Sequence, residues 1–226
     1  VEVMKEVNKT FGKISQTKKG NKVKTKENQT KPEVLIKFKE TDQTHFVLAF
    51  RSFDLNNKKN RILSILSGIL GAGMSSRLFV KLREEMGVGY YVRAYNDAYT
   101  DHGYFQISAG VDNKRVHEVL EAILKECKKL TLELVSEKEL NKVKECLIGN
   151  MKLSLESSDD IANYFGMQEL LKKEIKQLSE KEKELRKVTA KEVRDMAKVI
   201  FKDITMNLAL IGPFHDKENF IDILKF

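Results

Sequence analysis

The chain contains no tryptophan and only two cysteines, two prolines and four histidines among its 226 residues. The low cysteine count excludes a disulfide-rich secreted scaffold, and no apolar run approaches the roughly 20 residues that a membrane-spanning helix needs. Without tryptophan, the core must be built from Leu, Ile, Val and Phe. Hydrophobic residues at 41% and charged residues at 33% are typical of a globular protein that is large enough to bury a substantial core.

The two cysteines, Cys127 and Cys146, each lie at an apolar position of an expected helix. This pattern predicts two buried thiols in a reducing compartment, although a disulfide between neighbouring helices stays open as an alternative. Scarce cysteine and abundant lysine favour a cytoplasmic location.

The net charge of +8 raises the question of a nucleic-acid or membrane partner. Residues 1–31 hold nine lysines and three glutamates, a net charge of +6, which leaves about +2 for the rest of the chain. The positive charge therefore belongs to one arm, and most such lysine runs are solvated linkers. Because the arm has no arginine and one aromatic residue, Phe11, nucleic-acid binding is the weaker hypothesis. Salt-sensitive binding that is lost on removal of the arm would support it.

The N-terminal 31 residues are expected to lie outside the main domain. Residues 1–14 have apolar side chains at helical spacing, and residues 15–31 are almost wholly polar, which is typical of an exposed linker. We therefore interpret residues 1–31 as the terminal helix of a missing preceding domain followed by a lysine-rich linker. Residues 32–226 then form one domain.

Two kinds of periodicity predict the structure of this domain. Alternating apolar residues predict strands at 34–38, 46–53, 90–99, 103–111 and 204–211. Helical spacing predicts helices at 54–70, at 75–86 and from 116, and three capping-box signatures mark later helix starts: Ser136–Glu139, Ser179–Glu182 and Thr189–Glu192. Because hairpins and helices occur in separate runs, we expect a two-layer α+β sandwich, with an antiparallel or mixed sheet and helices packed on one face.

The histidines do not form a metal-binding motif. A common zinc peptidase needs two histidines at helical spacing beside a glutamate, whereas the four histidines are far apart: His45, His102, His117 and His215. His117 is followed by a glutamate but has no histidine partner four residues later, so we expect it to face solvent. Neither a Gly-x-Ser-x-Gly elbow nor an exposed, electropositive cysteine is evident. We therefore expect no metal ligand and no complete catalytic centre in this chain.

One segment, GAGMSSRLFVKLREEMGVGYYV at residues 71–92, has the features of a peptide-binding corner. After a glycine-rich helix stop, a new helix carries Arg83 at the border of its apolar face, and Tyr90 follows seven residues later, past a stop at Gly87. A guanidinium and a phenol at one corner can donate hydrogen bonds to the carbonyl oxygens of a bound strand. A surface arginine near a core tyrosine is the alternative interpretation.

The same segment resembles the C-terminal homologous domain of the pitrilysin, or insulinase, family of zinc peptidases, which includes the mitochondrial processing peptidases. That domain has a glycine-rich stop, a Ser-Ser-Arg-Leu helix start, a Leu-Arg pair and a tyrosine seven residues after the arginine. The matching residues are Gly73 to Leu78, Leu82–Arg83 and Tyr90. The resemblance extends over about residues 32–213 and includes the strand phrase at 43–47.

The resemblance implies a protein with two homologous domains. The N-terminal domain of such proteins bears an inverted His-x-x-Glu-His zinc motif, and the C-terminal domain has the same fold without zinc. The resemblance also implies that Arg83 and Tyr90 bind the substrate backbone and stabilise the tetrahedral intermediate. Because no inverted zinc motif occurs in this sequence, the zinc-bearing domain is expected upstream of Val1 or on another chain.

We therefore predict that the chain is the substrate-binding half of a zinc metalloendopeptidase that cleaves extended peptides. The chain alone is expected to be inactive, with zinc in the intact enzyme. The expected partners are a peptide substrate and a homologous zinc-bearing domain or subunit, and a dimer is one possible assembly. Neither nucleic acid nor a membrane is expected as a partner. The alternative is a non-catalytic peptide-binding or scaffold subunit of the same fold.

Overall fold

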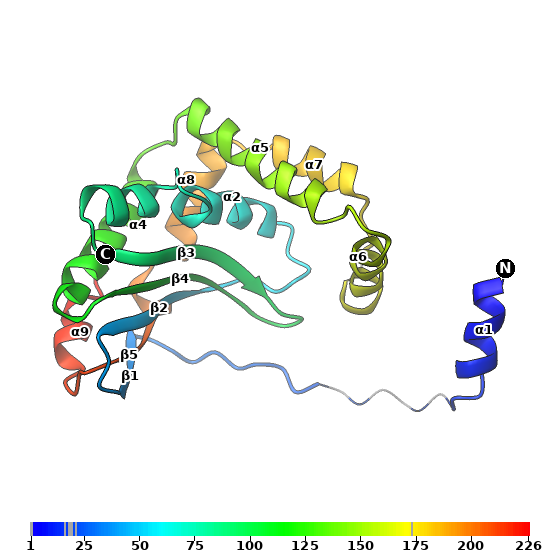
Figure 1. The fold of residues 1–226 in the computed structure, drawn as a ribbon, viewed down its shortest axis with the longest axis horizontal. Helices are drawn as coiled ribbons and strands as arrows, with labels where there is room; N and C mark the ends of the chain where they lie inside the picture. Colours follow the sequence, from blue (N-terminus) through cyan, green and yellow to red (C-terminus); the bar gives the residue numbers. More distant parts are fainter. Residues whose placement is uncertain (1, 16, 18–19, 21, 173) are drawn as a thin grey trace.

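A computed structural model describes every residue except 1, 16, 18, 19, 21 and 173. Its centre is a five-stranded sheet in the order β1-β5-β2-β4-β3, in which β1 and β5 are parallel and the other neighbours are antiparallel (Figure 1). The strands are β1 Glu33–Phe38, β2 Gln43–Ser52, β3 Gly89–Ala98, β4 Gly103–Asp112 and β5 Met206–Gly212. The predicted α+β fold is confirmed, and its sheet is mixed.

One face of the sheet forms the core because the central strands alternate between large apolar residues and other residues. In β2, Phe46, Leu48 and Phe50 point to the buried face and are at most 2% exposed. His45 and Arg51 alternate with them and lie on the opposite face. The sheet therefore has one face under the helices and one face free of them (Figure 1).

The helical layer lies on the apolar face of the sheet, as predicted, whereas the N-terminal helix α1 lies apart from it (Figure 1). They are α1 Glu2–Phe11, α2 Asn60–Gly71, α3 Arg77–Phe79, α4 Val116–Leu132, α5 Glu137–Leu153, α6 Ser158–Leu171, α7 Leu178–Arg186, α8 Ala190–Ile200 and α9 Glu218–Ile223, with a π-helix η1 at Val80–Glu85 and 3-10 turns η2 at Asn113–Arg115 and η3 at Asp203–Thr205. Nine of the twelve residues of α2 are buried, because α2 lies between the sheet and the outer helix α5. Within the part of the chain that is described, no helix is long and apolar enough to cross a membrane.

Two of the three predicted capping boxes mark true helix starts. In Ser136–Glu139 and Thr189–Glu192, the hydroxyl oxygen accepts a hydrogen bond from the glutamate N–H at 3.2 Å. The prediction for Ser179–Glu182 is wrong, because α7 begins two residues earlier. There the backbone N–H of Gln177 donates to Glu180 Oε2 at 2.7 Å, so a glutamine-based capping box starts the helix first.

The helix predicted from residue 54 begins later, at Asn60. Asp54 Oδ1 accepts a hydrogen bond from the backbone N–H of Asn56 at 2.8 Å, which closes a turn instead of capping a helix. The residues between this turn and α2 form a loop in front of the helix N-terminus.

The N-terminal segment leaves the compact domain (Figure 1). α1 has no buried residue, and Phe11 is 59% exposed. The linker is bonded to the domain in its later part, where Lys22 Nζ and the backbone N–H of Thr25 each donate to Asp101 at 2.9 Å. These hydrogen bonds hold the pKa of the Asp101 carboxyl well below its usual value, and the bond from Lys22 has the largest effect. The assignment of residues 1–31 to the terminal helix of a preceding domain and a lysine-rich linker stays a prediction.

The two cysteines have different environments. Cys127 is buried on α4, and burial raises the pKa of its thiol far above the ordinary value. Cys146 on α5 is exposed, so the prediction of two buried thiols is wrong for this residue. α5 is an outer helix that packs through Val143 and Leu147, and Cys146 lies beside that stripe. Both thiols are free.

Candidate functional site

The predicted corner begins where α2 meets β3. A Cβ atom on Gly71 would lie 2.2 Å from the backbone nitrogen of Ala94, so only glycine lets the end of α2 rest on the backbone of β3. Two residues later the chain reverses at Gly73, whose φ of 90° lies in the left-handed region. The predicted helix stop is confirmed, and the close approach fixes α2 against the edge strand β3.

The helix predicted over 75–86 has two parts. The α-helical turn α3 is followed by the π-helix η1, in which the backbone N–H of Met86 donates to the carbonyl of Lys81, five residues earlier, at 3.1 Å. Short π-helices occur frequently at functional sites, and this one carries Arg83.

Arg77 anchors this segment to the outer helix α5. Its Nε and Nη2 donate to the two carboxylate oxygens of Glu139, each at 2.8 Å, in a bidentate pair. The two side chains are only 22% and 28% exposed. The hydrogen bonds with Glu139 raise the pKa of Arg77 above its usual value. The pair therefore fixes the start of α3 on the helical layer.

Replacement of Arg77 by alanine should lower the free energy of unfolding by about 1–3 kcal/mol, because a partly buried carboxylate on Glu139 loses both donors. Urea denaturation followed by circular dichroism measures the change. The control is Lys81→Ala, which removes an exposed i,i+4 pair with Glu85 and should lower the free energy of unfolding much less than Arg77→Ala does. Equal losses in the two variants would contradict the anchoring role of Arg77.

Arg83 and Tyr90 meet at the start of β3, although the contact is to the backbone and not to the phenol. Arg83 Nη1 donates to the carbonyl oxygen of Tyr90 at 2.9 Å, and the guanidinium carbon lies 5.4 Å from the ring centroid of Phe79. Among the described residues, none accepts a hydrogen bond from the other N–H groups of the Arg83 guanidinium, and none forms a hydrogen bond with the Tyr90 hydroxyl. Tyr90 is 57% exposed. Both side chains therefore keep free donors at the protein surface, while their roles in binding stay predictions.

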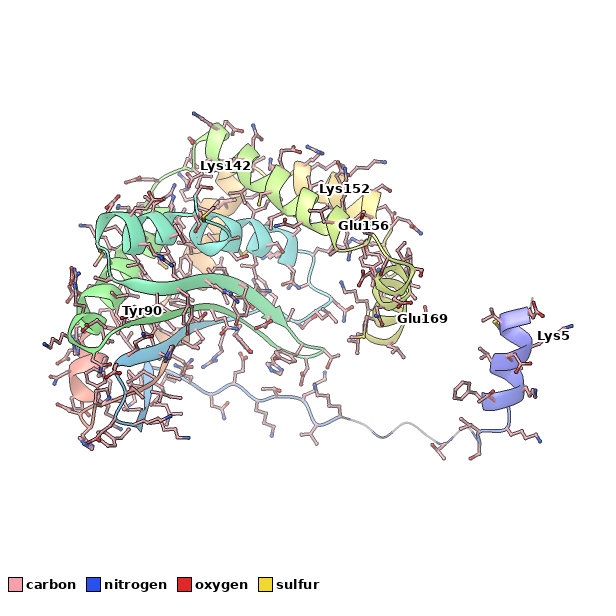
Figure 2. All side chains as sticks on the ribbon, viewed as in Figure 1. Lys5, Tyr90, Lys142, Lys152, Glu156 and Glu169 are labelled. Atoms are coloured by element: carbon pink, nitrogen blue, oxygen red, sulfur yellow. The ribbon has the colours of Figure 1, made fainter. Side chains whose placement is uncertain are left out.

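Tyr90 is the extra residue of a β-bulge. The residues on either side of it pair with the consecutive residues Gly110 and Val111 of β4, so Tyr90 has no partner in the ladder. Arg83 donates a hydrogen bond to the carbonyl of this bulged residue. β3 is the last strand of the sheet, and Figure 2 shows Tyr90 at the beginning of this edge. A bulge at an edge re-aims one side chain and interrupts the regular pairing there.

Sequence reasoning missed a pair of rings beside this corner. On the helix-free face, His45 Nδ1 and the Tyr91 hydroxyl oxygen lie 3.2 Å apart, and the two rings are nearly parallel. They reach each other across β4 above Gly110, where a Cβ atom would lie 2.6 Å from the Tyr91 ring. A glycine inside a strand was the only sequence signal for this close approach. We call these two side chains the His45–Tyr91 platform.

The environment of His117 corrects another prediction. Its ring is half-buried and stacks on Phe220 of α9 at 4.5 Å between centroids, so it does not face solvent. The reason is that α9 folds back against α4, a contact between distant parts of the chain. In the described part of the protein, no group of three or more His, Cys, Asp or Glu residues could hold a metal ion. The described residues therefore bring together no set of donors of the kind that zinc requires.

The sequence is similar to one family profile and to several bacterial proteins. Residues 1–147 match a family profile described as the peptidase M16 inactive domain. A Bacillus subtilis (strain 168) protein named an uncharacterized zinc protease is 33% identical over 210 residues, covering 93% of this chain and 51% of the relative. A similarly named protein of Streptomyces coelicolor is 29% identical over 180 residues, covering 80% and 39%. The chain thus spans about half the length of these relatives or less.

Solved structures share the architecture. A protease from Helicobacter pylori aligns with a TM-score of 0.86 at 20% identity, covering 94% of this chain and 52% of that one. A peptidase M16 inactive domain from Pseudomonas fluorescens aligns with a TM-score of 0.75 at 20% identity, covering 84% and 46%. At this identity the likeness concerns the fold alone.

Proposed function

Since this chain belongs to the peptidase M16 family as its inactive, C-terminal domain, we propose that it is the substrate-binding half of a zinc-dependent endopeptidase that cleaves extended peptides. In this proposal the metal and the nucleophile belong to a homologous domain outside these 226 residues, on the same chain or on a partner. Relatives named as zinc proteases, about twice as long as this chain, support the proposal. Two free thiols and abundant lysine support a cytoplasmic location.

The observation that carries the proposal is the corner of Arg83 and Tyr90 at the open edge of the sheet. The outward N–H and C=O groups of β3 would pair with an extended peptide by strand addition. The guanidinium and phenol would then donate to the oxygen of the scissile peptide bond as negative charge develops on it. The His45–Tyr91 platform lies beside this end of β3 and would contact a neighbouring side chain of the peptide.

The N-terminal segment supports a preceding domain. The apolar side chains of α1 recur at helical spacing and are all exposed, with Val3 at 75% and Val7 at 41%. An apolar helix face of this kind is stabilised when another surface covers it. In the proposal, α1 completes the zinc-bearing domain, and the linker, bonded to Asp101 from Lys22 onward, connects the two halves.

The test uses the full-length protein that contains this chain. We expect it to hydrolyse a fluorogenic extended peptide and to lose this activity with a zinc chelator. Tyr90→Phe should lower kcat/KM by about 30-fold or more, because the hydroxyl donor is lost while the ring remains. The matched control is Tyr95→Phe, an exposed tyrosine of the same strand, which should change kcat/KM by less than about two-fold. An unchanged kcat/KM in Tyr90→Phe would remove this residue from the site.

A second candidate function is a peptide-binding or scaffold subunit without catalysis. It is favoured by the description of the matching domain as inactive. This alternative predicts that the full-length protein lacks a His-x-x-Glu-His motif and binds the same peptide without hydrolysing it. Turnover that requires zinc would exclude it.

A further inference from the structure

Helix α6 carries apolar side chains that the described residues leave largely uncovered. Met167, Leu170 and Leu171 follow the i, i+3, i+4 spacing of one helix face and are 54%, 74% and 40% exposed. The only fully buried residue of α6 is polar, because Gln168 is 3% exposed. This arrangement reverses the usual pattern of a surface helix, which buries its apolar side chains. We call Met167, Leu170 and Leu171 the α6 face.

Polar bonds to one backbone position hold α6 in this orientation. The Tyr164 hydroxyl and Gln168 Nε2 both donate to the carbonyl oxygen of Lys176, at 2.9 and 3.3 Å. In return, the backbone N–H of Lys176 donates to Gln168 Oε1 at 3.1 Å. α6 has little contact with the other helices and strands of the described chain, and Figure 1 shows it beside the helices that cover the sheet rather than among them. The α6 face is therefore held outward, where another surface can cover it.

α6 lies at the end of the domain where the linker is bound. Lys22 Nζ donates to Asp101, in the turn between β3 and β4, at 2.9 Å. Close to this turn, the carbonyl of Tyr99 accepts a hydrogen bond from the backbone N–H of Leu55 at 2.7 Å. Leu55 in turn lines a cavity of about 490 Å³ together with Gln168 of α6. The N-terminal arm therefore leaves the compact domain at the same end as α6.

The free part of the linker is short. Ten residues separate Phe11, the last residue of α1, from Lys22, and a fully extended chain of this length spans at most about 40 Å. Along the longest axis of the molecule, α1 and α6 lie toward the same end (Figure 1). A domain that contains α1 is therefore restricted to the neighbourhood of the α6 end.

The charges of α6 disfavour a second copy of the chain as the occupant of this face. The helix contains three carboxylates and no basic residue, since Asp159, Asp160 and Glu169 are its charged residues. Two α6 helices paired across a two-fold axis would bring these like charges together. Residues 1–31 carry a net charge of +6 and are instead attracted to this negative helix.

We propose that the α6 face is the docking surface for the zinc-bearing half of the intact protein, joined to this chain through α1 and the linker. This inference rests on the function proposed above, in which α1 completes the zinc-bearing domain. The contact covers the three apolar side chains and leaves the carboxylates of α6 at its rim, as is usual in protein interfaces. Figure 2 shows Tyr90 and Glu169 of α6 at opposite ends of the domain, so docking at α6 leaves the corner of Arg83 and Tyr90 free for a peptide.

The reactivity of an introduced thiol tests this docking. Leu170→Cys is combined with Cys146→Ser, which leaves the buried Cys127 as the other thiol of the chain, and alkylation by iodoacetamide at position 170 is followed by mass spectrometry. We expect alkylation at least about ten-fold slower in the full-length protein than in the 226-residue chain, because the docked half excludes the reagent. The matched control is Leu134→Cys, which is 54% exposed and lies beyond the far end of α5, about 25 Å away along that helix. Its rate should differ by less than about two-fold between the two proteins.

Equal alkylation rates of Leu170→Cys in the two proteins would overturn the proposal. Protection in the isolated chain that increases with its concentration would also overturn it, because the occupant would then be a second copy. A second variant, Leu170→Glu, places a charge in the proposed contact. It should lower Tm of the full-length protein by about 3 °C or more and that of the 226-residue chain by less than about 1 °C. Equal shifts in Tm would contradict docking at this face.

The alkylation result and the peptidase activity can fail separately. Slow alkylation in a full-length protein that does not hydrolyse peptides would support the docking surface and contradict the proposed function. Equal alkylation rates in a full-length protein with zinc-dependent hydrolysis would overturn the docking surface alone.

Discussion

If the full-length protein is the peptidase proposed above, replacing Arg83 with alanine should lower its kcat/KM by about 100- to 1000-fold, a loss of about 3–4 kcal/mol of transition-state stabilisation. Two effects add in this variant. The proposed substrate site loses a charged donor, and the Tyr90 carbonyl loses the guanidinium N–H that lies 2.9 Å from it, so the β-bulge is less well fixed. Steady-state kinetics with a fluorogenic peptide measure the change.

Two further variants separate the contributions of Arg83. Arg83→Lys keeps the charge but not the planar fork of donors, so we expect an intermediate kcat/KM. Lys81→Ala removes an equal charge from the same π-helix, where Lys81 pairs with Glu85, and should leave kcat/KM close to that of the unmodified protein. If Arg83→Ala and Lys81→Ala had equal effects, net charge would account for both and Arg83 would have no specific role.

Gly71→Ala should destabilise the domain by about 3 kcal/mol, an effect at the upper end for overpacking. The added Cβ would lie 2.2 Å from the backbone nitrogen of Ala94 and 2.9 Å from the carbonyl carbon of Arg93. Because these are backbone atoms of β3, they cannot move aside as a flexible side chain can. Either α2 or the edge strand must shift, and urea denaturation measures the cost.

The control for Gly71 is a glycine on a helix with free space around it. A Cβ atom on Gly149 of α5 meets nothing within 4 Å. Gly149→Ala should therefore stabilise the protein by about 0.5–1 kcal/mol, since alanine loses less backbone entropy in a helix. Opposite signs for the two substitutions are the expected result. A neutral Gly71→Ala would show that α2 is not held against β3 at this point.

Local sequence patterns predicted the features that depend on neighbouring residues. The alternation of Phe46, Leu48 and Phe50 gave the buried face of β2, and the box Thr189–Glu192 gave a helix start. Prediction failed where two local signals compete. Asp54 can close a turn or cap a helix, and the turn forms because its carboxylate bonds to the N–H two residues on. Likewise Gln177 starts α7 before the predicted serine can.

Prediction also failed where a residue's neighbours come from a distant part of the chain. His117 is half-buried because α9 returns to α4, and Cys146 is exposed because α5 is an outer helix. The burial of His117 and the exposure of Cys146 do not follow from helical periodicity. Periodicity identifies the apolar face of a helix, but it does not identify the elements that pack against the helix.

The spacing of Arg83 and Tyr90, the glycine stops and the succession of strands and helices were sufficient to determine the α+β fold and the family, because each is a local pattern of residue types. The tertiary structure alone decided the mixed order of the strands, the bulge at Tyr90 and the His45–Tyr91 platform. Each of these depends on register or on distances between residues far apart in the chain. Such distances are fixed only when the sheet pairs and the helices pack on it.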